Sequence, residues 1–544
     1  MTGRLLLPAP SAGVTAVLAL GVAAASGLFA ARSAVLALAL AVFALGVVVL
    51  VRHPDFATLV VVAIVYSNAA VVAVKFHGVP PTATALVPML LMLPLAYHVA
   101  VRRQPLTITP ALPLVAAFGI VQAVAALGAT EPESAAFALQ TFVLEGIGLY
   151  FILTNVVRTF ETLRRIVWVL LVVGALLGTL SLVQVATGTY RNDYLGFAQT
   201  SDPETLEKTL EKQRTAAPGE VVQPRLAGPI GEKNRYAQIL LVLLPLGLFR
   251  YWNERSRPLK LLAAGATVLI GVGAALTLSR GAALGFAVML AIMAYRRYVT
   301  MYQLGAVVIG VLLVFAAIPA YQARVTPLLG LSSTSLEEGS ETAADNSIRG
   351  RAGEMGAAAL TFADHPVLGV GPGNFPFYYP DYANRLGLQV HAGIREAHSL
   401  YLDVAAETGA VGIVCFLAVV FVTLRELNRA RRRWRARSRE IADTAVAFEL
   451  AIVAQLATGL FLQQAYIRYF WLLMALAGAA AFIARSAASR EDTDEPTPSL
   501  GLASDARTAE HVNDERHAAA GSHQQDGSRG KTRVFPLKSS RAES

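Results

Sequence analysis

The residues best suited to acid–base chemistry lie in a polar, aromatic-rich segment from Asp364 to Gly412. Beyond His365, this segment holds His391 and His398. An imidazole has an ordinary pKa of about 6.5, so it can act as a general base at neutral pH. His398 comes just before a long apolar run, and the start of a membrane span there would hold its ring in place. A structural histidine that caps this span is the alternative.

The sequence GVGPG, from Gly369 to Gly373, has the composition of a phosphate-cradling loop. It does not follow an apolar strand or open a helix, and Pro372 interrupts it, so it is weak as a nucleotide signature. A tight turn is the interpretation that we favour.

Arginines at the ends of apolar runs could bind an anion. Arg280, in LTLSRGAALG, lies at the end of one predicted span and has apolar sequence on both sides. Ionisable residues in such positions usually face the bundle interior or a water-filled cavity, although an arginine can also reach the lipid headgroups. The neighbouring Ser279 and Gly281 allow close backbone approach, which favours a functional role.

Further cations come before another span and before a predicted surface helix. In PRLAGPIGEKNRYAQ, the side chains of Arg225, Lys233 and Arg235 could converge on an anion. For Lys233 and Arg235, an ordinary positively charged helix start is an equal alternative. Arg349 and Arg351 precede the helix predicted for RGRAGEMGAAALTFADHP, and both could simply be solvated. Arg351 is the better candidate of the two because it leads directly into that helix.

The composition indicates a membrane protein with many spans. Of the 544 residues, 55% are hydrophobic and 15% are charged, whereas about 25% are charged in a typical soluble domain. The mean hydropathy is +0.52, so the net charge of +9 is not an indication of nucleic-acid binding. The single cysteine, Cys415, excludes an intramolecular disulfide and a CxxC metal site.

Apolar runs long enough to cross about 30 Å of hydrocarbon predict an all-α polytopic membrane protein with about 12–14 transmembrane helices. The first run is interpreted as an uncleaved span, because Arg32 and a second apolar run follow it at once. The runs begin near Val14, Ser33, Leu59, Ala85, Ala111, Ala135, Ile166, Ala237, Leu259, Ala282, Leu304, Leu400, Ala445 and Tyr469.

The positive charges of the short loops predict the orientation, because Lys and Arg collect on the cytoplasmic side. Alternate loops carry these charges without an inversion, which places both termini inside. The basic positions are Arg52, Arg102, Arg103, Arg158, Arg164, Arg165, Arg250, Arg255, Arg257, Lys260, Arg296, Arg297 and the run from Arg425 to Arg439. The last run could also bind anionic headgroups, but we favour a role in topology.

The same pattern divides the chain into membrane parts and polar segments. Residues 1–320 are predicted to form a transmembrane bundle with an extracytoplasmic loop at about 188–233. Residues 321–397 form a large extracytoplasmic loop, and residues 398–486 return as C-terminal transmembrane helices. The polar remainder, residues 487–544, is predicted to be a disordered cytoplasmic tail.

Four blocks between Arg225 and about Phe421 resemble the O-antigen ligase / O-antigen polymerase superfamily of bacterial envelope glycan assembly. In order, they are RLAGPIGEKNRYAQILLVLLPL, TLSRGAALG, RGRAGEMGAAALTFADHPVLGVGPGNF and AHSLYLDVAAETGAVGI. Their order, their spacing and their placement on one predicted face carry the resemblance jointly. Ser399 follows the histidine at the position where the family usually has Asn.

The resemblance implies an inverting, metal-independent glycosyltransferase with a GT-C-like helical fold and no cofactor. Its donor would be a polyprenyl-diphosphate-linked glycan, and its acceptor a hydroxyl of a glycan, a lipid or a protein. It would lie in the cytoplasmic (inner) membrane, among membrane lipids, with its active site on the extracytoplasmic side. The resemblance assigns Arg225 and Arg280 to the donor diphosphate and groups Arg351 with them. It assigns His398 to activation of the acceptor hydroxyl.

The chemistry agrees with these assignments. A leaving lipid diphosphate develops charge that guanidinium groups can bind in bidentate fashion without a metal. A neutral imidazole can take the proton of the attacking hydroxyl. The predicted outer loops Ala30–Ser33 and Lys75–Pro81 contain no Asp or Glu, which argues against a metal-dependent relative with acids in its first outer loop.

Other functions stay open at this point. Ligases, polymerases and protein O-glycosyltransferases share these motifs, so the sequence does not choose among them. A flippase or other transporter of polyprenyl-linked glycans should carry internal repeats and midplane charges in broken helices. The chain shows no repeat, and its candidate charges gather at one face. A non-catalytic scaffold would leave Arg280 and His398 without a role.

Overall fold

The structure is a computed structural model, and the residues that it describes are 54–81, 87–200, 206–207, 209–211, 224–317, 343–388, 395–462 and 468–494. The chain divides into two compact units, Met1–Ala488 and Ser489–Ser544, and the following concerns the first. The predicted spans near Val14 and Ser33 lie outside the described residues, as do His391 and the tail beyond Asp494.

The described residues are mostly helical, and six stretches among them are long and apolar enough to cross a membrane. A bent pair, α3 (Pro54–Tyr66) and α4 (Ala69–His77), makes a seventh if the two helices, which meet at 56°, count as one span. The six are α8 to α9 (Pro132–Val156, with η2 at Phe142–Gly148), α10 (Phe160–Thr187), α14 (Arg257–Leu276), α20 (Leu400–Trp434), α21 (Arg439–Thr458) and the part Arg468–Ala488 of α22 (Arg468–Asp494). The predicted all-α polytopic membrane fold is confirmed.

Shorter helices occupy the other predicted runs. They are α6 (Met92–Ala96), η1 (Tyr97–Val101), α7 (Leu112–Ala126), α12 (Lys233–Leu241), α13 (Leu243–Asn253), α15 (Arg280–Tyr295) and α16 (Met301–Ala317). Every predicted run from Leu59 onward therefore coincides with helix. Helices α12 and α13 are separate because the ring of Pro245 would clash with the carbonyl of Leu241 in a continuous helix.

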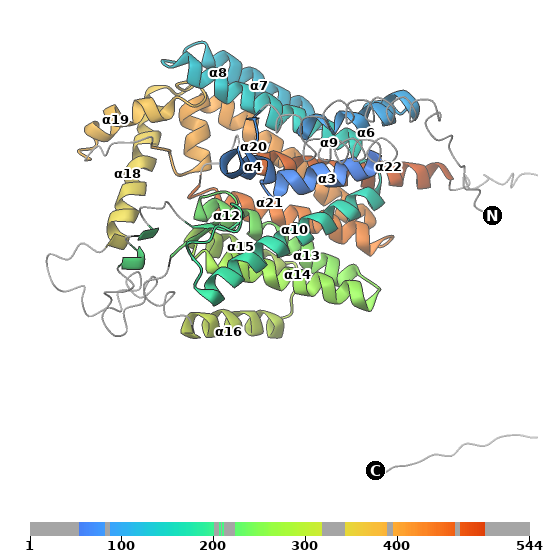
Figure 1. Ribbon diagram of the computed structural model, residues 1–544. Coiled ribbons are helices and arrows are strands. Elements are labelled where there is room, and N and C mark those ends of the chain that lie inside the picture. Colours follow the sequence, from blue (N-terminus) through green and yellow to red (C-terminus); the bar gives the residue numbers. More distant parts are fainter. Residues whose placement is uncertain are drawn as a thin grey trace, which may run out of the picture. The chain divides into compact units, whose positions relative to one another are not determined.

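Glycines and aromatic side chains pack the helices closely. Helix α10 lies against α14 (Figure 1), and a Cβ added to Gly273 would lie 2.7 Å from the Cα of Gly178. Small residues allow such close approach between membrane helices. The ring of Phe142 lies 5.3 Å from that of Phe118 and 5.2 Å from that of Trp471, centroid to centroid, which joins η2 to α7 and α22.

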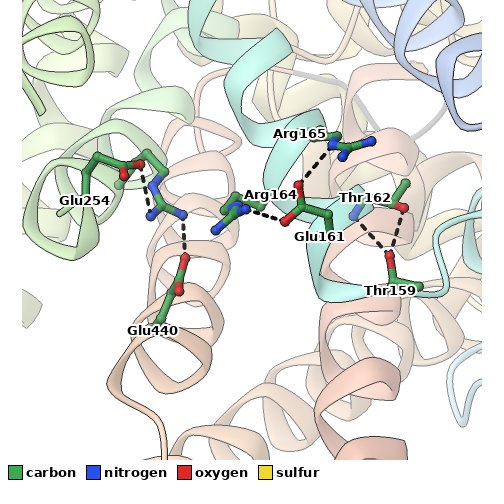
Figure 2. Close-up of polar contacts among 8 residues, drawn as sticks. Thr159, Glu161, Thr162, Arg164, Arg165, Glu254 and Glu440 are labelled. Carbon is green, nitrogen blue, oxygen red and sulfur yellow. Dashed lines mark hydrogen bonds and ion pairs between the residues drawn. The ribbon is translucent and has the colours of Figure 1, made fainter. Parts of the chain in front are cut away.

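Loops that the sequence assigns to the cytoplasm contact one another. We call this region the Arg-rich end, and it contains residues 158–165, 250–257, 296–297 and 425–443. The buried Arg250 binds Glu254 at 3.3 Å and Glu440 at 2.7 Å, and Figure 2 shows both carboxylates approaching one guanidinium. Figure 2 also shows the first turn of α10, where Thr159 caps the helix and Glu161 lies between two arginines.

Polar segments that the alternation of charge assigns to the other side of the membrane also contact one another. We call this region the loop end, and it contains residues 127–134, 224–232, 277–279, 371–388 and 395–399. Asn374 accepts a hydrogen bond from the amide of Glu131 at 2.8 Å, and Ser134 donates one to the carbonyl of Gly373 at 2.9 Å. These contacts join segments that the alternation of charge assigns to the same side, and the sidedness itself stays a prediction.

Two helices and a small sheet lie in or next to the loop end. Helix α18 (Ala343–Asp364) ends two residues before Pro366, as predicted, and α19 (Phe375–Arg385) follows it; both lie at the left of Figure 1. Between them, the amide of Asn374 donates to the carbonyl of Gly371 at 3.2 Å and closes a turn. The interpretation of GVGPG as a tight turn is confirmed. The strands β1 (Gln199–Thr200) and β2 (Leu226–Gly228) pair antiparallel.

Helix α20 is interrupted near its start, and the segment after α18 fills the break. Gly409 has φ 65° and ψ −167°, a conformation that is essentially restricted to glycine. The amides of Val370 and Gly371 donate to the carbonyls of Ala406 and Glu407, both at 3.0 Å. On the other side of the break, the amide of Ala410 donates to the carbonyl of Pro366 at 2.8 Å. The apolar run from Leu400 gave no indication of this interruption.

Replacement of Gly409 by Ala should destabilise the protein strongly. An added Cβ would lie 2.2 Å from both the carbonyl carbon and the oxygen of Val367, and the strained backbone adds about 1–3 kcal/mol. We expect a lower thermal unfolding midpoint and faster proteolysis between α18 and α19. Gly387→Ala is the matched control, because Gly387 also has a positive φ, of +68°, but open space around it. Equal stability of the two variants would contradict this account of the break.

Candidate active site

The structure brings Arg225 and Arg280 to the same turn. Arg225 comes directly before β2, and its Nη2 donates to the carbonyl of Leu278 at 3.4 Å. Helix α14 ends at Leu276, and α15 begins at Arg280. Arg225 therefore reaches the short connection that presents Arg280, although 53 residues separate Arg225 from Leu278 in sequence.

A hydrogen-bonded network joins the first turns of α12 and α15. The Glu232 side chain caps α12 by accepting from the amide of Arg235 at 2.7 Å, and it also accepts from the Asn234 side chain at 3.1 Å. Ser279, the N-cap residue of α15, donates to the Asn234 side chain at 3.0 Å. Helix N-termini carry partial positive charge, so two of them meet here together with Arg280.

A five-residue segment, Arg395–Ser399, crosses this region before α20 begins, and we call it the strap. Arg395 binds Glu354 of α18 at 3.2 Å. At the next residue, Oε2 and Oε1 of Glu396 accept hydrogen bonds from Nη2 of Arg235, at 3.0 and 3.2 Å. Ala397 is fully buried against α18 and α19. At the end of the strap, the amide of Leu400 donates to the carbonyl of Gly459 at 2.8 Å.

His398 lies on the strap with its imidazole facing a buried carboxylate. Its Nε2 is 3.2 Å from Oε2 of Glu354, whose side chain is 4% exposed, whereas that of His398 is 31% exposed. Burial lowers the pKa of His398 below its ordinary value of 6.5. Glu354 opposes this effect on the pKa and Arg351 adds to it. The imidazole is therefore neutral at pH 7 and open to a reactant.

The remaining predicted cations take different places. Arg351 lies three residues before Glu354 on α18, so the two side chains share a helix face, and the effect of Arg351 on the pKa of His398 shows that the two are near each other. The side chain of Arg349 lies outside what the structure describes. Arg235 binds an anionic group, but that group is Glu396 of the protein itself. Lys233 is the first residue of α12.

Two acidic side chains of this region were not singled out from the sequence. Glu354 contacts His398 and Arg395, and Glu396 binds Arg235. The helical spacing from Arg351 to Glu354 was the one available signal, because it places both on one face of a predicted helix. Among the described residues, no three of His, Cys, Asp and Glu gather as metal ligands would.

The lowered pKa of His398 gives a testable pH dependence. A general base must be neutral, so activity that depends on His398 should fall as the pH drops through its pKa. Because that pKa lies below 6.5, the acid limb of the rate profile should have its midpoint below 6.5. The measurement is the initial rate against pH with the fold monitored in parallel. A midpoint above 6.5 with an intact fold would contradict the assignment of His398 as a buried neutral base.

Comparison with known protein families identifies a match to part of the chain. Residues 236–417 match the family model described as O-antigen ligase. The matched segment contains Arg280, Arg351, Glu354 and His398, and Arg225 lies shortly before it. No curated protein matches the chain.

Proposed function

We propose that this member of the O-antigen ligase/polymerase superfamily transfers a glycan from a polyprenyl-diphosphate carrier to a hydroxyl acceptor. Its residues 236–417 match the O-antigen ligase family model. At the family level it is a glycan-processing membrane enzyme with a polyprenyl-linked glycan as substrate. The proposal adds the donor chemistry, the acceptor chemistry and the residues that carry each. It also assigns the loop end to the extracytoplasmic side of the cytoplasmic membrane.

Arg225, Arg280 and Arg351 bind the donor diphosphate in this proposal. When the bond between the anomeric carbon and the diphosphate oxygen breaks, negative charge develops on the leaving group. Guanidinium groups stay charged and fit phosphate oxygens in bidentate fashion. The hydrogen bond from Arg225 to the Leu278 carbonyl supports this role, because it brings that side chain to the start of α15 and to Arg280. The positive ends of α12 and α15 favour an anion at the same place.

His398 acts on the acceptor. The acceptor oxygen attacks the anomeric carbon from the side opposite to the diphosphate, its proton passes to the imidazole, and the configuration at that carbon inverts. A positioned base of this kind contributes about 10²–10⁴-fold to a rate. The step needs neither a cofactor nor a metal as base, and we propose that the reaction is metal-independent.

One observation carries the proposal: the strap that holds His398 is bonded to α18, which carries Arg351, and to α12, which is bonded to the N-cap of the helix that begins at Arg280. It is joined to α18, which carries Arg351, through Glu354. It is joined to α12 through the pair of Arg235 with Glu396, and α12 is in turn bonded to the N-cap of α15. These links support the proposal that the base and the diphosphate-binding arginines act in one site.

Deletion of the gene, followed by analysis of lipid-linked and mature envelope glycans, tests the proposal. Loss of long chains would identify a polymerase, and loss of glycan from its final lipid or protein acceptor would identify a ligase or a protein O-glycosyltransferase. In each case the lipid-linked glycan should accumulate in the outer leaflet. Accumulation in the inner leaflet would instead indicate a flippase and overturn the proposal.

A further inference from the structure

We propose that Glu354 is the positioning residue for His398: it binds the Nε2–H of the imidazole and leaves Nδ1 as the nitrogen that takes the proton of the acceptor. This inference rests on the proposed function. It adds a second residue to the acceptor half of the site and specifies which atom of the imidazole reacts.

The contacts of Glu354 show which nitrogen of the His398 ring faces the carboxylate. One carboxylate oxygen, Oε1, accepts from Arg395 Nη1 at 3.2 Å, and the other, Oε2, lies 3.2 Å from His398 Nε2. An ionised carboxylate can only accept hydrogen bonds, so Nε2 carries the hydrogen. The neutral ring then has its lone pair on Nδ1. Because the Glu354 side chain is only 4% exposed, water competes little for this contact.

Other contacts fix the main chain of the strap, and Glu354 orients the imidazole of His398. His398 has φ 48°, an uncommon conformation for a residue with a side chain, and such strain persists where the surroundings fix the chain. Here the fixing contacts are the pair of Glu396 with Arg235 and the bond from the Leu400 amide to Gly459. They hold the main chain on both sides of His398. The ring itself is directed by Glu354.

The charge of Glu354 also affects the basicity of His398, second to burial. The charged groups near the imidazole are Glu354 and Arg351 from α18, Glu396 from the strap and Glu232 from the cap of α12. Burial is the largest influence and lowers the pKa of His398, and Glu354 is the group that most raises it. Removal of the Glu354 charge should therefore lower the pKa of His398 further and make the imidazole a weaker base.

Glu354→Gln in the full-length protein tests the inference. Gln retains the size of Glu but not its charge, and its amide can turn its NH₂ toward the ring. Turnover should fall by more than about 10-fold but no more than the about 10²–10⁴-fold loss expected without the base. The acid limb of the rate profile should also move to lower pH. If Glu354 had only a structural role, the substitution would lower the amount of folded protein without moving the acid limb of the rate profile.

The matched control is Asp364→Asn, on the same helix. Asp364 is exposed and accepts from the Tyr382 hydroxyl at 3.0 Å, so this change removes a carboxylate of α18 that does not contact His398. It should leave turnover and the pH profile unchanged. Wild-type turnover and pH profile in the Glu354→Gln variant would overturn the inference. If that variant does not fold, Glu354→Asp replaces it; Asp keeps the charge but reaches less far, and wild-type turnover would again overturn the inference.

A double variant separates this inference from the proposed function. In a His398→Asn background, Glu354→Gln should cause no further loss of turnover, because Glu354 acts through the histidine. A further loss as large as in the wild-type background would overturn the positioning role. If His398→Asn alone retains full turnover, the base of the proposed function is wrong, and this inference falls with it. If His398→Asn is inactive and Glu354→Gln is not impaired, only this inference fails.

Discussion

His398→Asn should reduce glycan transfer by about 10²–10⁴-fold, the contribution of a general base. The proposed base lies on the strap and is partly exposed, and its partial burial holds its pKa below the ordinary value. No other described histidine lies on the strap. Asn is the preferred replacement because it tolerates a positive φ, so the backbone at φ 48° is retained while the base is lost.

Donor binding should survive this change. The side chains proposed to bind the diphosphate come from other elements, so the dissociation constant of the lipid-linked donor should stay near that of the wild type. His365→Ala is the control: this histidine follows α18, and its ring lies 5.6 Å from that of Tyr378, centroid to centroid. The control should transfer glycan normally. Transfer by His398→Asn at the rate of the control would exclude the general-base role.

Arg280→Lys should reduce transfer by about 10- to 100-fold. Hydrogen bonds to charged groups are worth about 1.5–3 kcal/mol, and about 1.4 kcal/mol corresponds to tenfold in rate. Lysine retains the charge but not the planar fork that binds two phosphate oxygens together. Because Arg280 is the exposed first residue of α15, the change should leave the fold intact and act on the site alone.

Arg257→Lys is a closely matched control for this prediction. Arg257 is also the exposed first residue of an apolar helix, α14, but it lies at the Arg-rich end. The relevant measurements are kcat/KM for the lipid-linked donor and the thermal unfolding midpoint of both variants. Equal activity of the two lysine variants would show that Arg280 does not clamp the diphosphate.

The membrane fold could be predicted from sequence because its signals are local. The apolar runs from Leu59 onward predict the helices of the membrane part. The alternation of basic loops is consistent with the contacts of Arg250 with Glu440 and of Asn374 with Glu131. A span is determined by the hydropathy of about 20 consecutive residues. Such a feature does not depend on distant parts of the chain.

The contacts that bring the candidate site residues together could not be predicted from local sequence signals. Residue type and position predict the candidates Arg225, Arg280, Arg351 and His398. The hydrogen bond from Arg225 to the carbonyl of Leu278 spans 53 residues and has no local signature. Glu354 resembles a solvated charge on a surface helix until α18 packs against α20. The break at Gly409 has no signal in the sequence, because a single glycine in an apolar run does not interrupt its hydropathy.

The central claim is that glycan transfer releases the lipid diphosphate, with His398 as base. The most direct measurement uses purified protein in liposomes, lipid-linked glycan from the deletion strain as donor, and an extract of that strain's envelope as the source of hydroxyl acceptor. The wild type should release polyprenyl diphosphate in equal amount to the glycan transferred, and His398→Asn should release almost none. Movement of intact lipid-linked glycan between leaflets without diphosphate release, or equal release by both proteins, would contradict the account.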